Sequence, residues 1–336
     1  MTENKTTNRV QPCIWPTASV LTLANRWDHF LARWGVRRAE HRIEPGLYAL
    51  GTPKEDSPVF VTANYTLSFD ALRSALAGHD GYILVLDTKG INVWCAAGKG
   101  TFGTDELVRQ IEATGLHKVV HHRVLILPQL GATGVAGHEV KKRSGFRVEY
   151  GPIRAADLPE YIESHKATPE MRQVTFHLSE RLVLIPVELV QVLLPMIIAG
   201  VGLFFLAGFL VALGVVSAIL TGVVLFPILL PWLPTLNFST KGFVLGGAAA
   251  FPFALAAILG HPQWPWWMRI GWGLIGMFAL SPVTAFLALN FTGSTPFTSK
   301  SGVRREIFAY VPTMAIVFGT GLTMAIVLSL VRILGG

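Results

Sequence analysis

Residues 82–87 have the sequence Tyr-Ile-Leu-Val-Leu-Asp, an apolar run that ends on a carboxylate. Such a run is typical of a strand that is buried on both faces of a sheet. Residues 58–62 (Pro-Val-Phe-Val-Thr) and 123–127 (Arg-Val-Leu-Ile-Leu) have the same character. Helical patterns separate the runs, at residues 68–77 and 104–113. Strands that alternate with helices predict a parallel sheet with helices on both faces.

The alternation continues with an expected helix at 134–144, a strand at 146–150 and a helix at 155–163. Residues 23–34 are expected to form a further helix, with a packing role. Ligands of parallel sheets bind beside the carboxyl ends of the strands. The loops of interest are therefore those that follow Thr62, Asp87, Leu127 and Tyr150.

Charged residues are distributed unevenly along the 336 residues of the chain. Residues 1–181 contain 22 Lys and Arg and 19 Asp and Glu, whereas residues 182–336 contain six and two. The few charged residues of the second half cannot cover a water-soluble surface. The composition therefore excludes a wholly soluble protein. The first half has an ordinary globular composition, which excludes a bare membrane bundle.

The second half accommodates five helices of the length that a bilayer span requires, about 20 apolar residues each. We expect them at residues 193–213, 215–234, 242–260, 270–291 and 307–331. Their interiors carry no charged residue, which favours an anchor over a transporter. The Lys and Arg residues between the spans predict a multi-pass protein of the inner (cytoplasmic) membrane, with the first half in the cytoplasm.

The chain is thus expected to contain four segments. They are an N-terminal extension (1–57), an α/β domain (58–166), a linker (167–192) and an all-α transmembrane domain (193–336). The first ten residues are polar and no apolar stretch follows them, so no secretory signal peptide is expected. Basic and acidic residues nearly balance in the first half, and no nucleic-acid partner is expected.

The loop after Asp87 contains two glycine-rich patterns that fail on closer inspection. Residues 98–103 match G-x-G-x-x-G, but ten residues separate them from the strand and no carboxylate follows about 20 residues later, as a dinucleotide site requires. A phosphate-binding Walker loop is excluded because Lys99 is followed by Gly100 and position 93 is Val.

Cys95 is the most distinctive residue of this loop. Asn92 is a favourable N-cap, which would place Cys95 at the third helical position, where the helix dipole lowers the pKa of a thiol. Residues 96–98 (Ala-Ala-Gly) leave a face that suits the approach of a large, flat molecule. A thiolate there resembles an axial ligand to a metal in a macrocycle.

Two other interpretations of Cys95 remain open. It can be a buried, unreactive residue of a short helix, or a nucleophile activated by His121, His122 or His138. Cys13 and Cys95 are the only cysteines of the chain, too few for a disulfide framework, a four-cysteine zinc site or an iron–sulfur cluster.

Residues 92–99 (Asn-Val-Trp-Cys-Ala-Ala-Gly-Lys) resemble the cap-helix signature of the mercury-methylating corrinoid proteins, the HgcA family. That family is similar to the corrinoid iron–sulfur protein of the acetyl-CoA pathway over its cofactor domain. Residues 61–65, 127–131 and 138–155 and the five-span C-terminal half add to the resemblance.

The resemblance implies that residues 58–166 form a Rossmann-like domain that binds a cobalamin-type corrinoid. It implies that Cys95 is the catalytic residue and coordinates the cobalt from the lower axial side. The cofactor-binding residues that we expect come from the cap helix and from two other loops of the domain. They are Thr62, Asn64, Thr66, Asn92, Val93, Trp94, Cys95, Ala96, Ala97, Gly98, Lys99 and Gly131.

The resemblance further implies a corrinoid-dependent methyltransferase that passes a methyl group from the Cys-ligated methylcobalt corrinoid to Hg(II), forming methylmercury. A methyl-tetrahydrofolate-derived donor and a ferredoxin-like partner with two [4Fe–4S] clusters are implied with it, and the membrane lipid surrounds the spans. The alternative is a corrinoid methyl carrier of one-carbon metabolism with another acceptor. A transporter with a cytosolic regulatory domain is the third hypothesis.

Overall fold

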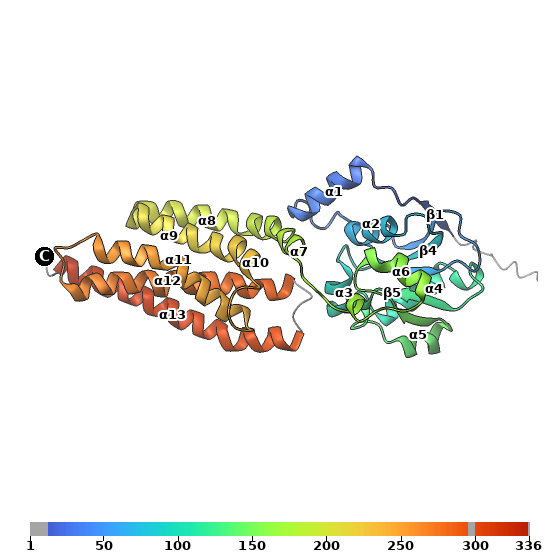
Figure 1. The fold of residues 1–336 in the computed structure, drawn as a ribbon. Helices are drawn as coiled ribbons and strands as arrows, with labels where there is room; N and C mark the ends of the chain where they lie inside the picture. Colours follow the sequence, from blue (N-terminus) through green and yellow to red (C-terminus); the bar gives the residue numbers. More distant parts are fainter. Residues whose placement is uncertain (1–12, 295–299, 335–336) are drawn as a thin grey trace, which may run out of the picture. The chain divides into compact units, whose positions relative to one another are not determined.

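The computed structural model describes residues 13–294 and 300–334. They divide into two compact units, Met1–Ala32 with Val36–Val174, and Arg33–Gly35 with Thr175–Gly336. The first is a mixed α/β unit and the second is helical (Figure 1).

A six-stranded sheet forms the centre of the α/β unit within the described residues. Its strands are β1 (Ile14–Thr17), β2 (Gly46–Leu50), β3 (Val59–Ala63), β4 (Gly81–Leu86), β5 (Val124–Leu127) and β6 (Arg147–Tyr150), in the order β1-β2-β4-β3-β5-β6. The four strands expected from the sequence, β3 to β6, pair in parallel as predicted. The expectation of a wholly parallel sheet was wrong, because β2 runs antiparallel to β4.

Residues 1–57, expected as an extension, contribute β1 and β2 to this sheet. The helix expected at residues 23–34 is confirmed as α1 (Leu23–Arg33). Residues 13–32 and 36–57 therefore belong to the α/β unit, although the short strands β1 and β2 carry no long apolar run that would have revealed them.

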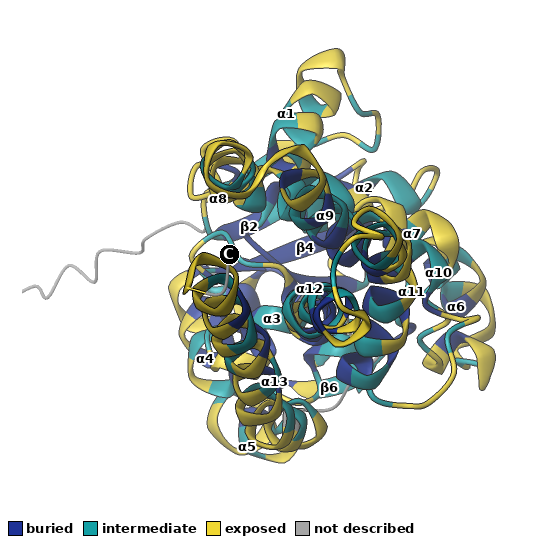
Figure 2. Ribbon diagram, turned by 90° about the vertical axis from the view of Figure 1, so that its left-hand side faces the viewer, coloured by how far each residue is buried: buried dark blue, intermediate teal, exposed yellow. Residues whose placement is uncertain are grey.

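Helices cover both faces of the sheet, as predicted. Alternate strand residues point to opposite faces, so that Val61 and Leu84 belong to one apolar cluster and Phe60 and Ile83 to another. The first cluster includes residues of α3 (Val93–Lys99), α4 (Thr104–Ala113) and α5 (Gly137–Ser144). The second includes residues of α2 (Thr66–Ala75) and α6 (Leu158–Ser164). Figure 2 shows β4 in the colour of buried residues.

Some predicted helix starts are displaced for identifiable reasons. The helix expected from residue 68 begins at Thr66, with Tyr65 as its N-cap. The helix expected at residues 104–113 is confirmed as α4, and the Thr104 hydroxyl accepts a hydrogen bond from the backbone N–H of Ala136 at 2.8 Å. That bond fixes the segment before α5, which starts at Gly137 instead of residue 134.

The second unit contains five helices that are long and apolar enough to cross a membrane, at 178–207, 209–229, 238–259, 266–293 and 301–334. They comprise α7 (Leu178–Leu182), α8 (Ile185–Ala207), α9 (Phe209–Leu220), the π-helix η5 (Thr221–Leu225), α10 (Phe226–Leu229), α11 (Phe238–Leu259), α12 (Trp266–Ser294) and α13 (Lys300–Leu334). The outer surface of α8 is exposed in Figure 2, and its apolar Phe205 is 80% exposed.

The boundary expected between the first two spans, near residue 214, was wrong. The chain turns at Gly208, whose φ of +89° favours glycine. Gly214 instead lies inside α9, where a Cβ atom would meet Leu280 at 3.2 Å. Both glycines stand in an uncharged stretch, so no charged residue marks the true turn.

Two cationic side chains of this unit donate hydrogen bonds to backbone carbonyl groups at a helix end. Arg181 donates to the carbonyl oxygens of Pro227 and Ile228, at 2.7 Å each. The Lys241 Nζ atom donates to the carbonyl of Leu230 at 2.7 Å. The last carbonyls of a helix lack partners within the helix and carry partial negative charge. These cations therefore have a structural role.

Candidate functional site

The helix that carries Cys95 is capped at both ends by its own sequence. Asn92 is the N-cap of α3, and its side-chain Oδ1 accepts a hydrogen bond from the Cys95 N–H at 2.9 Å. Gly100, at φ 86°, ends the helix. The predictions that Asn92 caps this helix and that Cys95 is its third residue are thus confirmed.

Asn64 holds the loop that leads into α3. Its Oδ1 accepts hydrogen bonds from the Thr88 N–H (3.0 Å), the Thr88 hydroxyl (2.9 Å) and the Gly90 N–H (3.0 Å). Its Nδ2 donates to Asp87 Oδ1 at 3.2 Å. Asn64 is only 2% exposed, so its amide oxygen is committed to this loop. Asn64 therefore positions α3, independently of any contact that it makes with a ligand.

Thr62 and Thr66, expected beside Asn64 at the same edge, are also buried there. Thr62 lies in β3, and Thr66 begins α2 with its N–H donating to the His41 carbonyl. The structure thus brings the three residues to the carboxyl end of β3, and their role in binding stays a prediction.

The Cys95 thiol is partly buried, and burial raises its pKa above the ordinary value. The positive charges of Lys99 and Arg38 and the hydrogen bond with Asn92 lower this pKa, but by less than burial raises it. The expectation of a lowered thiol pKa was therefore wrong for the protein without ligand, because desolvation of the thiolate outweighs the favourable contacts.

The alanine face of α3 is covered by the protein itself. Ala96 and Ala97 are 0% and 4% exposed and pack with Phe102 and Val135 in the core. A Cβ atom on Gly134 would lie 2.9 Å from the Ala97 Cα. The 131–135 loop packs closely on these alanines, and their expected contact with a cofactor stays a prediction.

The open part of α3 is a different set of residues. Trp94 and Cys95 are partly exposed, and Gly98 and Lys99 are exposed, whereas Val93 is buried. A Cβ atom on Gly98 would meet nothing within 4 Å. A ligand can therefore approach α3 from the side that presents the sulfur.

Gly131 lies at the end of the 3₁₀ helix η2 (Gln129–Gly131) and is buried. A Cβ atom there would lie 2.6 Å from the ring of Phe102. Close packing therefore accounts for this glycine, and its expected contact with a cofactor stays a prediction.

The histidines considered as partners of Cys95 have other contacts. His121 pairs with Glu55 at 2.7 Å, and His122 contacts the Ser57 carbonyl at 2.9 Å. Both precede β5, whereas α3 follows β4, so they lie at the opposite edge of the parallel strands. His138 stands 3.7 Å from Glu139. Within the described residues, no group of three or more His, Cys, Asp and Glu could hold a metal ion.

Three residues around Cys95 were not predicted from the sequence. Arg38 acts on the thiol through its charge, Thr88 is fully buried under Asn64, and Glu106 accepts a hydrogen bond from the Asp87 N–H at 2.8 Å. The position of Thr88 directly after a strand was a usable signal. No sequence signal links Arg38 to Cys95.

Comparison with known proteins identifies relatives of this part of the chain. The family model described as CO dehydrogenase/acetyl-CoA synthase delta subunit (CdhD) matches residues 37–161. The acetyl-CoA decarbonylase/synthase complex subunit gamma of Methanopyrus kandleri is 36% identical over 128 residues. The α/β unit is related to these acetyl-CoA pathway subunits. The corresponding subunit of Methanothermobacter thermautotrophicus is 31% identical over 152 residues.

The similarity is confined to a part of each protein. The matched stretches cover 38% and 45% of this chain and only 27% and 31% of the two relatives. All twelve expected cofactor-binding residues lie within residues 37–161, whereas α1 and the five apolar helices lie outside them. The named relatives are not described as mercury-methylating proteins.

Proposed function

We propose that this chain is a membrane-anchored corrinoid protein that carries and transfers a methyl group, and that Cys95 is the residue that would hold the cobalt ion. The observation that carries the proposal is the partly exposed Cys95 sulfur in the first turn of α3, at the carboxyl edge of the parallel strands. Binding sites of such sheets lie at this edge. The relation to acetyl-CoA decarbonylase/synthase subunits over the same residues supports it.

The residues around Cys95 fit a corrinoid. A thiolate is a suitable soft ligand, and the space beside Gly98 is open. The bound corrinoid would supply the cobalt ion that takes up and releases the methyl group. Asn92 and Asn64 fix the backbone that carries the sulfur. Cys95 must lose its proton to coordinate a metal, and the positive charges of Lys99 and Arg38 favour that loss.

We further propose Hg(II) as the methyl acceptor. The observation in favour is the sequence of residues 92–99, which resembles the signature of the mercury-methylating family. A thiolate donates more electron density than water or imidazole, which suits transfer to a soft, electrophilic metal. A methyl-tetrahydrofolate-derived donor, a reducing ferredoxin-like partner and an inner-membrane location with the α/β unit in the cytoplasm belong to this proposal.

A corrinoid carrier of one-carbon metabolism is the second candidate. The comparisons by themselves favour it over mercury methylation, because the named relatives are acetyl-CoA decarbonylase/synthase subunits. Deleting the gene separates the two. Loss of methylmercury formation with unchanged growth on one-carbon compounds supports Hg(II), and the reverse result supports the carrier.

Both candidate functions require corrinoid binding, which is tested with the purified full chain in detergent. After incubation with hydroxocobalamin and gel filtration, we expect the protein fraction to retain corrinoid absorbance. A protein fraction that is well folded by circular dichroism but colourless would refute corrinoid binding.

The sulfur–cobalt bond is expected to depend on pH. Because the raised pKa keeps the Cys95 thiol protonated near neutral pH, the thiolate fraction grows about tenfold per pH unit below that pKa and then levels off. Sulfur-ligated absorbance should therefore increase with pH. Replacing Lys99 with Gln removes a charge that lowers this pKa, so the midpoint should move to higher pH. Lys99→Arg is the control and should titrate like the wild type. A midpoint that is the same in Lys99→Gln and in the wild type would show that the charge of Lys99 does not act on the Cys95 sulfur.

A further inference from the structure

Helix α1 exposes its apolar side. Leu23 is 85% exposed, Trp27 62% and Phe30 47%, and these residues follow one another at helical spacing. The rings of Trp27 and Phe30 stack with their centroids 5.3 Å apart. Amphipathic helices of soluble domains usually place such residues against the core. The packing role expected for these residues of α1 is therefore not what the structure shows.

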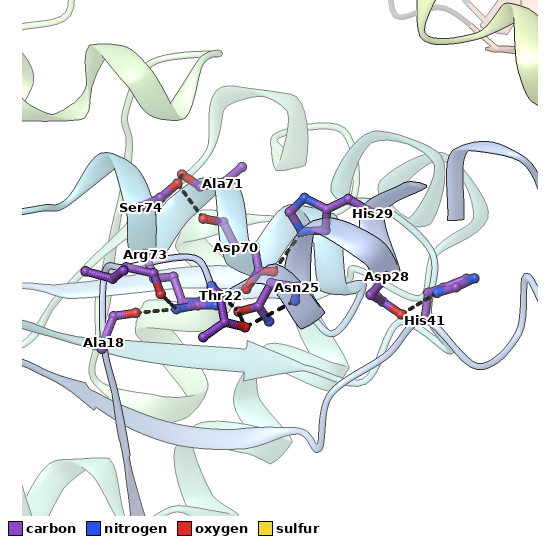
Figure 3. A network of polar contacts seen from close by, with 11 residues as sticks. Ala18, Thr22, Asn25, Asp28, His29, His41, Asp70, Ala71, Arg73 and Ser74 are labelled. Carbon is purple, nitrogen blue, oxygen red and sulfur yellow. Dashed lines mark hydrogen bonds and ion pairs between the residues drawn. The ribbon is translucent and has the colours of Figure 1, made fainter. Parts of the chain in front are cut away.

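The polar side of α1 holds the helix to the protein. His29 Nε2 lies 2.7 Å from Asp70 Oδ2, and Asp28 Oδ1 lies 2.7 Å from His41 Nδ1 (Figure 3). The side chain of Asp70 is 2% exposed and also binds Arg73 at 2.6 Å. These contacts fix the rotation of α1 about its own axis, and its apolar side therefore faces outward.

Basic residues accompany the exposed apolar side. Arg26 and Arg33 belong to α1 and are exposed, and the exposed Arg37 and Arg38 follow shortly after it. The acidic residue of α1, Asp28, is engaged by His41. Apolar aromatic residues beside arginines match the chemistry of an anionic membrane surface.

The same chain provides such a surface nearby. The α/β unit ends at Val174, and the first membrane-length helix begins at Leu178. Only residues 175–177 separate the two, so a short segment tethers the α/β unit to the helices. Both α1 and these helices lie outside residues 37–161, which match the family of acetyl-CoA pathway subunits.

We propose that α1 lies in the interface of the chain's own bilayer, with Leu23, Trp27 and Phe30 inserted and the neighbouring arginines on anionic lipid headgroups. The inference rests on membrane anchoring alone and does not depend on the corrinoid function.

The test places a nitroxide label at Leu23→Cys in full-length protein that carries Cys13→Ala and Cys95→Ser, reconstituted into vesicles containing phosphatidylglycerol. We expect the collision ratio of the label with oxygen over a water-soluble nickel chelate to exceed that at Glu112→Cys by about tenfold. Glu112 is an exposed residue of α4 and serves as the matched control site. Arg26→Glu should lower the ratio at position 23, and Arg26→Lys should not.

Two outcomes would overturn the proposal. A label at position 23 that is as accessible to the nickel chelate as the label at position 112 would show that α1 remains in water. Dipolar broadening between labels of two molecules would assign the apolar side to a second copy of the chain. In both cases the proposed corrinoid function stands unchanged.

Discussion

Replacing Cys95 with alanine is expected to abolish methyl transfer while leaving the protein folded. The sulfur is the single atom that the proposal assigns to cobalt, and its removal leaves no comparable donor on α3. We expect the rate to fall by at least about a thousandfold, which corresponds to about 4 kcal/mol of lost transition-state stabilisation. The sulfur–cobalt charge-transfer absorbance should disappear as well. Alanine is the best helix former and keeps the N–H that Asn92 caps, so the melting temperature should hardly change.

The control for this variant is Cys13→Ala, because Cys13 is the other cysteine and is exposed. It should show wild-type activity and the wild-type spectrum. A Cys95→Ala protein that retains full activity and an unaltered corrinoid spectrum would end the axial-ligand mechanism. Corrinoid retention without activity would instead separate the binding role of the domain from the chemical role of the sulfur.

Much of the α/β unit is predictable because the sequences of its central strands are long apolar runs. Residues 82–86 are buried on both faces, as their composition indicates. The sequences of β1 and β2 contain no such apolar run. Ile14–Thr17 is four residues long and contains a proline, and Gly46–Leu50 begins with glycine. They are strands because β2 pairs with the edge of β4 and β1 pairs with β2, which is a tertiary effect.

The candidate site shows the same division between local and distant causes. The cap by Asn92 spans three residues and is therefore readable from the sequence. The burial of Ala96 and Ala97 depends on Phe102 and on the loop near Gly134, which pack on them only in the folded unit. The raised pKa of Cys95 follows from the partial burial of its own thiol, so the helix position alone predicted the wrong direction.

Replacing Asn64 with alanine is expected to be the most destabilising change at the site. It removes the acceptor of the buried Thr88 N–H and of the half-buried Gly90 N–H, and one of the two partners of the Thr88 hydroxyl. Buried groups left without partners cost about 1–3 kcal/mol each, so a loss of about 3–5 kcal/mol is expected. For a unit of this size, that lowers the melting temperature by about 6–20 °C. Thermal unfolding of the full chain in detergent measures the loss.

The local consequence of Asn64→Ala distinguishes a positioning role from a general loss of stability. Without the amide oxygen, the loop at residues 87–90 should open, and its backbone N–H groups should exchange with deuterium faster than those of β3 and β4. Asn25→Ala is the matched control, because Asn25 bonds with Thr22 at the start of α1 and not with this loop. It should leave exchange in residues 87–90 unchanged. If Asn64→Ala melts and exchanges like the wild type, the loop before α3 is held by other contacts, and Asn64 becomes free to be tested as a ligand of the cofactor.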